Sequence, residues 1–157
     1  MEDILRLVEK EGRDIERIAS KLGKRREEVK EIIERAEREG VILGYRGIVD
    51  WEKLGKSEVI AIVEVKVEPK RDVGFDFIAE RIARLPESIF VYLISGTNDI
   101  FLLIKGRSIE EISSFVSKRI AGMEGVKGTE THFVLKKYKE GGIFFEEKAE
   151  KRIPLSF

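Results

Sequence analysis

The chain has 157 residues, enough for one or two small domains. Hydrophobic residues make up 42% of it, so the sequence can form a packed core and is not that of a disordered chain. Its 30 basic and 30 acidic residues give zero net charge, which by itself offers no support for binding a polyanion such as DNA.

Missing residue types exclude several kinds of site. The chain has no cysteine, which rules out disulfides, zinc fingers and thiol chemistry, and with His132 as its one histidine we predict no histidine-based metal site and no cofactor. No apolar run approaches the ~20 residues of a membrane helix. Acidic Glu2 and Asp3 follow Met1 where a leader would be basic, so we expect a cytoplasmic protein without a membrane partner. Abundant Lys, Arg and Glu without glutamine suggest a thermophile.

Three short amphipathic patterns open the chain, at residues 3–10, 14–21 and 25–39, each with apolar residues at helical spacing. Asp14 is placed to cap the second helix, and Gly23 lies in the turn before the third. Residues 14–39 therefore have the spacing of a helix-turn-helix.

A helix stop and a short β-ribbon are predicted next. Gly40 is suited to end the third helix, residues 41–43 and 48–49 read as two strands, and Gly44 permits the turn between them. Three helices closed by such a ribbon form a winged helix-turn-helix, which places one helix in the DNA major groove. We assign residues 1–50 to this domain and 51–56 to a linker.

The remaining chain predicts a βαββαβ order. Strands are expected at 59–67, 89–95, 99–105 and 129–138, and helices at 75–85 and from 109 onward, the latter with Ser108 and Glu111 as a capping box. This is the ferredoxin-like arrangement, an antiparallel sheet with two helices on one face. We predict an α+β protein whose second domain is a ferredoxin-like αβ-sandwich at 57–140, with a C-terminal extension at 141–157.

The predicted strands 59–67 and 99–105 are apolar on both faces, whereas a sheet with one solvated face should alternate. Two helices cover one face only, and a large apolar patch left in water is rare. We therefore expect the second face to pair with another copy in a two-fold dimer. The alternative is that the 141–157 tail covers it.

This layout resembles the Lrp/AsnC, or feast/famine, family of transcription regulators over nearly the whole chain. The segments that carry the resemblance are IASKLG at 18–23, EGVILGY at 39–45, VDWEKLG at 49–55, the 96–99 turn, GV at 125–126 with TET at 129–131, and IPL at 153–155. The resemblance implies a ferredoxin-like domain of the RAM type, and homodimers that assemble into tetramers or octamers.

The resemblance also implies a small effector, often an amino acid, bound by the second domain. It places the contacts in the hairpin turn and at the start of the last strand, here Gly96, Thr97, Asn98, Asp99, Thr129, Glu130 and Thr131. A glycine turn exposes N–H groups that can hold a carboxylate, and Asp99 can pair with an α-ammonium. For Asp99 the alternative is a capped turn, and for the threonines an ordinary place in a strand.

The candidate contacts to double-stranded DNA are cations at the start of the third helix and in the wing, namely Lys24, Arg25, Arg26, Lys30 and Arg46. The alternative is a solvated face of ion pairs at helical spacing. Residues 24–39 carry six basic and six acidic side chains, so we expect weaker or more selective DNA binding than is typical of the family.

No nucleophile–base pair and no phosphate-binding loop stand out in the sequence, so we predict no enzymatic activity and name no catalytic residue. The favoured interpretation is a DNA-binding transcription regulator that senses a small metabolite. The alternative is a metabolite-binding or co-assembling family member that has lost autonomous DNA binding.

Overall fold

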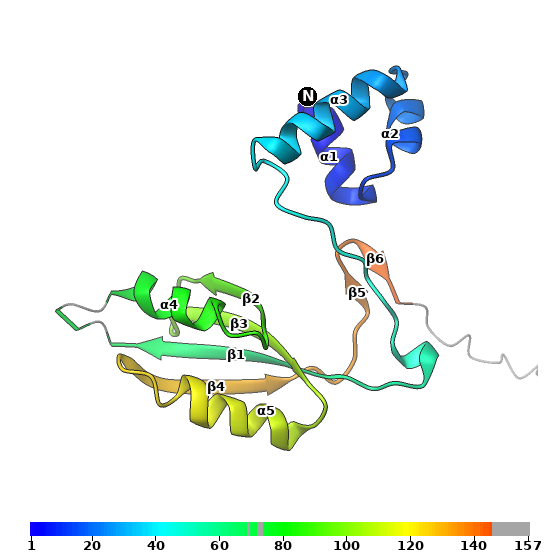
Figure 1. The fold of residues 1–157 in the computed structure, drawn as a ribbon. Helices are drawn as coiled ribbons and strands as arrows, with labels where there is room; N and C mark the ends of the chain where they lie inside the picture. Colours follow the sequence, from blue (N-terminus) through cyan, green and yellow to red (C-terminus); the bar gives the residue numbers. More distant parts are fainter. Residues whose placement is uncertain (69, 72–73, 146–157) are drawn as a thin grey trace, which may run out of the picture. The chain divides into compact units, whose positions relative to one another are not determined.

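The computed structural model describes residues 1–68, 70–71 and 74–145, and these divide into two compact units. One unit comprises Met1–Val49 with the described residues from Tyr138 onward, and the other comprises Asp50–Lys137 (Figure 1). Within the described residues, no helix is long and apolar enough to cross a membrane. The similarity noted for IPL at 153–155 and most of the 141–157 tail lie outside the described residues.

The first unit is built on three helices, α1 Glu2–Glu11, α2 Ile15–Leu22 and α3 Arg26–Arg38. Their apolar stripes meet in one core that contains Ile4, Ile18, Val29 and Ile33, all fully buried. The Asp14 side chain accepts the N–H of Arg17, which confirms the predicted cap of α2.

The turn between α2 and α3 depends on Gly23, whose φ of 61° lies in the left-handed region. The N–H of Lys24 then donates to the carbonyl of Ala19, closing the end of α2. This fixes the angle at which α3 leaves the turn, so the three helices form the predicted helix-turn-helix.

The predicted wing is wrong, because no strand forms at 41–43 or at 48–49. The N–H groups of Val41 and Ile42 both donate to the carbonyl of Ala36, so they terminate α3 and are not free for a ribbon. Ile42 packs into the helical core. Further along, a Cβ at Gly141 would lie 2.7 Å from Cδ1 of Ile48, so this segment instead lies against the hairpin of β5 Lys139–Glu140 and β6 Ile143–Phe144.

The second unit confirms the α+β, βαββαβ prediction. After the short 3-10 turn η1 Glu52–Leu54, the elements in chain order are β1 Val59–Val67, α4 Phe75–Ala83, β2 Ser88–Leu93, β3 Ile100–Gly106, α5 Ile109–Phe115, the π-helical turn η2 Val116–Ile120 and β4 Val126–Phe133. The strands form an antiparallel sheet in the order β2-β3-β1-β4.

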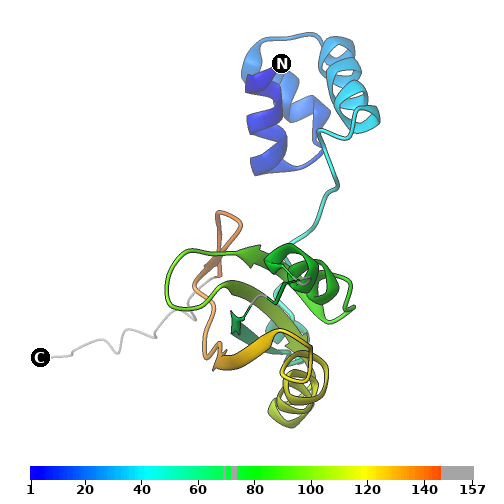
Figure 2. The same ribbon diagram turned by 90° about the vertical axis from the view of Figure 1, so that its left-hand side faces the viewer.

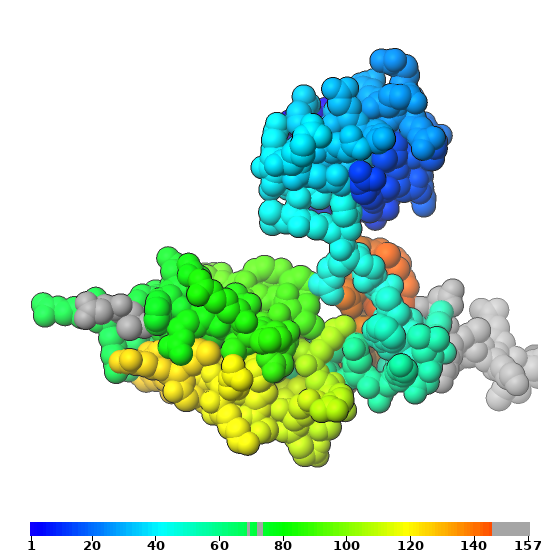
Figure 3. All heavy atoms as spheres, viewed as in Figure 1, coloured from blue at the N-terminus to red at the C-terminus, as the bar shows by residue number. Residues whose placement is uncertain are grey.

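Both helices lie on one face of this sheet, as the view turned by 90° shows (Figure 2). In the space-filling view they cover the face turned to the viewer, α4 in green and α5 in yellow (Figure 3). Beneath them, Val63, Val65, Ile100 and Leu102 are fully buried. Neither α4 nor α5 covers the other face, which we call the open face.

Candidate functional site

The helix-turn-helix presents one side of α3 to solvent. Val29 and Ile33 anchor the opposite side in the core, and their burial fixes which side chains point outward. The exposed or half-exposed positions along that outer side are Glu27, Lys30, Glu31, Glu34 and Arg38. An HTH module uses this side, and above all its N-terminal end, to reach bases and phosphates.

Three of the predicted DNA contacts already hold a carboxylate. Lys24 Nζ lies 2.9 Å from Glu28 Oε1 and Lys30 Nζ lies 3.7 Å from Glu34 Oε1, both one helical turn away. Arg26 Nη1 lies 2.8 Å from Glu16 Oε1 on α2. This face therefore carries both the predicted cations and the ion pairs that were the alternative interpretation. The pairs are exposed, so DNA phosphate can replace the carboxylates.

Of the remaining two candidates, Arg46 also pairs with a carboxylate, whereas Arg25 pairs with none among the described residues. Arg25 is the N-cap residue of α3, is exposed, and forms no ion pair with any residue that the structure describes. Arg46 lies in the irregular segment that replaces the predicted wing, with Nη2 3.7 Å from Glu140 Oε1. Arg25 is thus the candidate best placed to meet DNA without first breaking an ion pair.

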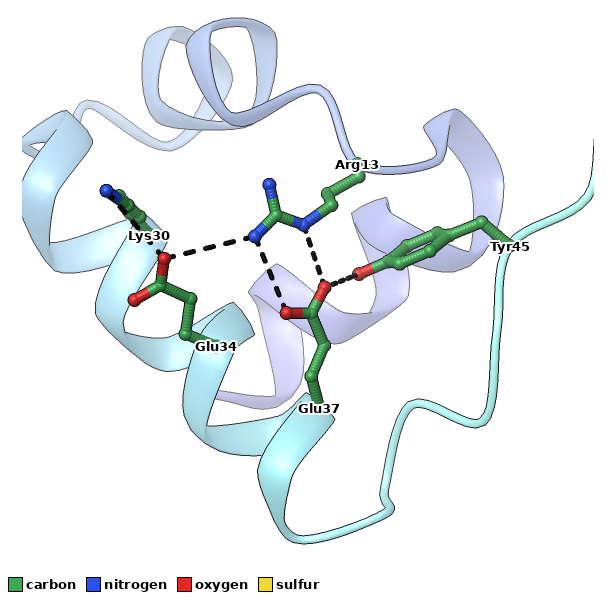
Figure 4. A network of polar contacts seen from close by, with 5 residues as sticks. All are labelled: Arg13, Lys30, Glu34, Glu37 and Tyr45. Atoms are coloured by element: carbon green, nitrogen blue, oxygen red, sulfur yellow. Dashed lines mark hydrogen bonds and ion pairs between the residues drawn. The ribbon is translucent and has the colours of Figure 1, made fainter.

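A polar network fastens α3 to the segments on either side of it (Figure 4). Glu37 Oε1 accepts hydrogen bonds from Arg13 Nε at 2.8 Å and from the Tyr45 hydroxyl at 2.7 Å. Arg13 Nη2 lies 4.0 Å from Glu34 Oε1, and Glu34 also pairs with Lys30. The network therefore ties the α1–α2 loop and the chain after α3 to the helix proposed to read DNA.

The network makes an acid-sensitive contribution to stability. The hydrogen bond from Arg13, followed by that from Tyr45, holds the pKa of the Glu37 carboxyl below its ordinary 4.5. A folded-state pKa below the unfolded value adds stability above the unfolded pKa, and this is lost as pH falls through the folded value. Glu37→Gln should therefore lower the urea midpoint at about pH 7 and lose this effect below about pH 4. Glu39→Gln, at the exposed C-cap of α3, is the control. An equal deficit at both pH values would contradict this origin.

The predicted effector turn in the second unit is held against β1. The N–H of Asp99 donates to the carbonyl of Val65, and Asp99 Oδ2 accepts the N–H of Val67 at 2.8 Å. Lys66 Nζ donates to the carbonyl of Thr97 at 2.8 Å and lies 3.5 Å from Asp99 Oδ2. Asp99 therefore bonds to the neighbouring strand and holds the turn in place.

The other predicted effector residues fall on two faces of the sheet. Thr129 and Thr131 lie opposite Val65 and Val63 in the β1–β4 register and share the helix-covered face. Glu130, between them, lies opposite Glu64 on the open face, where Asn98 Nδ2 donates to Glu64 Oε2 at 3.1 Å.

This division follows from the two-residue period of a strand. The structure thus brings Asn98 and Glu130 together through Glu64 and separates them from the two threonines. Gly96 and Thr97 are exposed in the turn itself.

Sequence reasoning missed the group formed on the open face by Glu64, Glu130 and His132, whose side-chain N and O atoms lie within 4.8 Å of one another. The sequence shows Glu130 and His132 at alternate positions of one strand, and Glu64 on another. The group became readable only with the register that sets Glu64 opposite Glu130.

The open face also carries an apolar patch, which we define as Ile62, Phe90, Tyr92, Phe101 and Leu103. In the register, Ile62 and Phe90 flank Leu103, and Tyr92 lies opposite Phe101. The Tyr92 ring stacks on Phe90 and Phe101 at centroid distances of 6.0 and 6.2 Å. Tyr92 is 52% exposed in the single chain. This is the partly exposed apolar surface that the sequence predicted.

A basic hollow of about 590 Å³ lies between α4 and η2, lined by Arg81, Arg84, Lys118 and Arg119 together with Leu85, Gly122, Met123 and Glu124. None of the predicted site residues lines it. The four cations stand at the C-terminal ends of the two helical segments, where the helix dipole favours positive charge, so helix stability accounts for them.

A helix-turn-helix, which places one helix in the DNA major groove, is here joined to a βαββαβ sheet domain, so the chain has the layout of a two-domain DNA-binding regulator. The chain belongs to the Lrp/AsnC family. The family model described as the Lrp/AsnC ligand binding domain matches residues 60–144. The resemblance read from the sequence is therefore confirmed.

The relatives agree over nearly their full length. The uncharacterized HTH-type transcriptional regulator YugG of Bacillus subtilis (strain 168) is 44% identical, over 98% of this chain and 95% of YugG. The HTH-type transcriptional regulator FL11 of Pyrococcus horikoshii is 32% identical, over 87% and 88%. A feast or famine regulatory protein from M. tuberculosis complexed with L-methionine has the same fold, with a TM-score of 0.69 at 21% identity over 88% and 92% of the two chains.

Proposed function

We propose that this protein regulates transcription by binding duplex DNA through α3 and by sensing an amino acid through the sheet domain. The observation that carries the proposal is the α2–turn–α3 geometry. The apolar core of the three helices fixes α3, and Arg25 and Arg26 lie at its N-terminal end, where recognition helices contact DNA. Relatives over the whole chain are HTH-type transcriptional regulators, which supports the same conclusion.

The alternative, a family member that co-assembles but no longer binds DNA by itself, is favoured by the charges of α3. Lys24, Arg26 and Lys30 each hold a carboxylate, so contact with phosphate must first displace it. The gain from counterion release is then reduced. Arg25 is the observation that argues for retained DNA binding.

Fluorescence-anisotropy titration separates the two proposals. The protein is titrated against duplex DNA from upstream of its own gene, with scrambled duplex as control, at two salt concentrations. Preference for the native sequence by ~10³-fold, the low end for specific recognition, supports the regulator. Equal binding to both duplexes, or none at either salt concentration, supports the co-assembling member.

The proposed effector is an amino acid held at Gly96–Asp99. Glu130 lies at the same end of the sheet on the open face, and Thr129 and Thr131 lie there on the helix-covered face. The N–H groups of Gly96 and Thr97, in the exposed part of the turn, suit a carboxylate, and Asp99 suits an α-ammonium. The M. tuberculosis protein of the same fold is complexed with L-methionine, which supports this ligand class. Titration of the protein with a panel of amino acids identifies which one it binds.

Asp99→Asn should weaken binding of the effective amino acid by at least ~10-fold, because the amide keeps an acceptor for Val67 but loses the charge. Calorimetry on the wild type and the variant is the measurement, and Asp76→Asn on α4 is the control. Unchanged affinity in Asp99→Asn would leave Asp99 with a structural role only.

The proposed assembly is a homodimer formed across the open face, the first step toward a tetramer or octamer. The apolar patch spans β2, β3 and β1 on that face, and the charged residues Glu64 and Glu130 lie beside it, which is the composition of an interface core and rim. A two-fold pairing would cover the patch in both copies at once.

A further inference from the structure

The group on the open face is fixed by strand geometry. Glu64 on β1 lies directly opposite Glu130 on β4, and His132 follows Glu130 by two residues, opposite Ile62. The intervening Thr131 and the facing Val63 belong to the helix-covered face. Two adjacent strands of one sheet therefore hold all three side chains, which gives the group a rigid base.

The distances between the side chains suit a single coordination sphere. His132 Nε2 lies 3.5 Å from Glu130 Oε1 and 3.9 Å from Glu64 Oε2, and all three atoms lie within 4.8 Å of one another. Two ligands ~2.1 Å from a tetrahedral metal ion are roughly 3.4 Å apart. The distance from His132 to Glu64 exceeds this by about half an ångström, and the His132 and Glu130 side chains, 50% and 61% exposed, are free to rotate toward a shared ion.

The facing carboxylates of Glu64 and Glu130 favour binding of a cation. Like charges directly opposite in an antiparallel pair destabilise it, and Glu64 and Glu130 are such a pair. Lys66, two residues along β1 on the same face, is engaged by the carbonyl of Thr97 and by Asp99. The Asn98 amide donates to Glu64 Oε2, as an outer partner that orients a ligating carboxylate does.

We propose that Glu64, Glu130 and His132 bind a divalent transition-metal ion, with Asn98 orienting Glu64. An imidazole nitrogen with two carboxylate oxygens selects Zn²⁺ or its neighbours over Mg²⁺ and Ca²⁺, which prefer oxygen ligands alone. Three protein ligands leave a coordination position for water or a further ligand. Through Asn98 the ion lies one hydrogen bond away from the 96–99 turn, so its binding would stabilise that turn.

The test is calorimetric titration of Zn²⁺ into the full chain, wild type and three single variants. The wild type should bind one ion per chain. His132→Gln and Glu130→Gln should each weaken binding at least ~10-fold, the smallest loss usual even for outer-shell partners. Glu58→Gln, which removes a carboxylate paired with Lys105 outside the group, should bind as the wild type does. Because the chain has one histidine and no cysteine, the imidazole NMR signals report on His132 alone.

Urea unfolding of the metal-free proteins checks that the variants fold. Glu130→Gln removes the like-charge pair, so its midpoint should equal or exceed that of the wild type. Zn²⁺ should raise the midpoint of the wild type and leave that of His132→Gln unchanged. Wild-type affinity in Glu130→Gln, loss of binding in Glu58→Gln, or no saturable binding in the wild type would each overturn the site. None of these outcomes depends on whether the protein binds DNA or an amino acid.

Discussion

Replacing Arg25 and Arg26 together with alanine is expected to weaken binding to the native DNA site by at least ~30-fold. A side chain that contacts a base contributes ~1–3 kcal/mol, so two contribute at least about 2 kcal/mol. If both residues contact phosphate instead, the slope of log K against log salt should fall by about 1.8. Anisotropy titrations at several salt concentrations measure both quantities.

The matched control is Arg6→Ala on α1, which removes an exposed arginine paired with Glu2 outside the turn and α3. Folding is not at risk in the double variant, because the pair of Arg26 with Glu16 is exposed and such pairs contribute little. If the double variant keeps the affinity and the salt slope of the wild type, Arg25 and Arg26 do not contact DNA.

Phe101→Asp is expected to convert the proposed homodimer into monomers. Phe101 lies on β3, the middle one of the three strands that carry the apolar patch, and its ring stacks on that of Tyr92. A carboxylate buried there without a partner costs several kcal/mol, and a two-fold interface meets that cost twice. The dimer dissociation constant should rise by at least ~10³-fold, as measured by sedimentation over a range of concentrations.

Phe77→Asp is the control for this experiment. Phe77 is an exposed phenylalanine of the same domain, on α4, where Arg81 lies over its ring. The substitution makes the same chemical change away from the open face and should leave the assembly intact. Monomers from both variants would indicate general destabilisation, and an intact dimer in Phe101→Asp would place the interface elsewhere.

The parts of the fold that local chemistry determines were predictable. The caps at Asp14 and Ser108, the left-handed turn at Gly23 and the two-faced strands each follow from a few neighbouring residues. The wing was not predictable in this way. The apolar run at 41–43 suits a strand, but its N–H groups close the end of α3, and that choice depends on how Ile42 packs in the helical core.

The candidate sites, too, could be predicted only where they depend on neighbouring residues and not on long-range packing. The cations of α3 could be named from the sequence, yet the partner of Arg26 is Glu16 on another helix, which only the packing of α2 against α3 supplies. Thr129, Glu130 and Thr131 read as one motif although strand alternation sends Glu130 to the other face. Long-range register also assembles Glu64 with His132, from residues 68 positions apart in the sequence.

Carboxylates already hold Lys24, Arg26 and Lys30, three of the cations proposed to contact DNA. Random duplex offers these cations only an exchange of one anion for another, whereas the correct site adds base contacts that repay it. Such a protein dwells briefly on most of a genome. A larger share of its copies then remains unbound and available for assembly, and occupancy of a true operator becomes more sensitive to how many copies the cell holds.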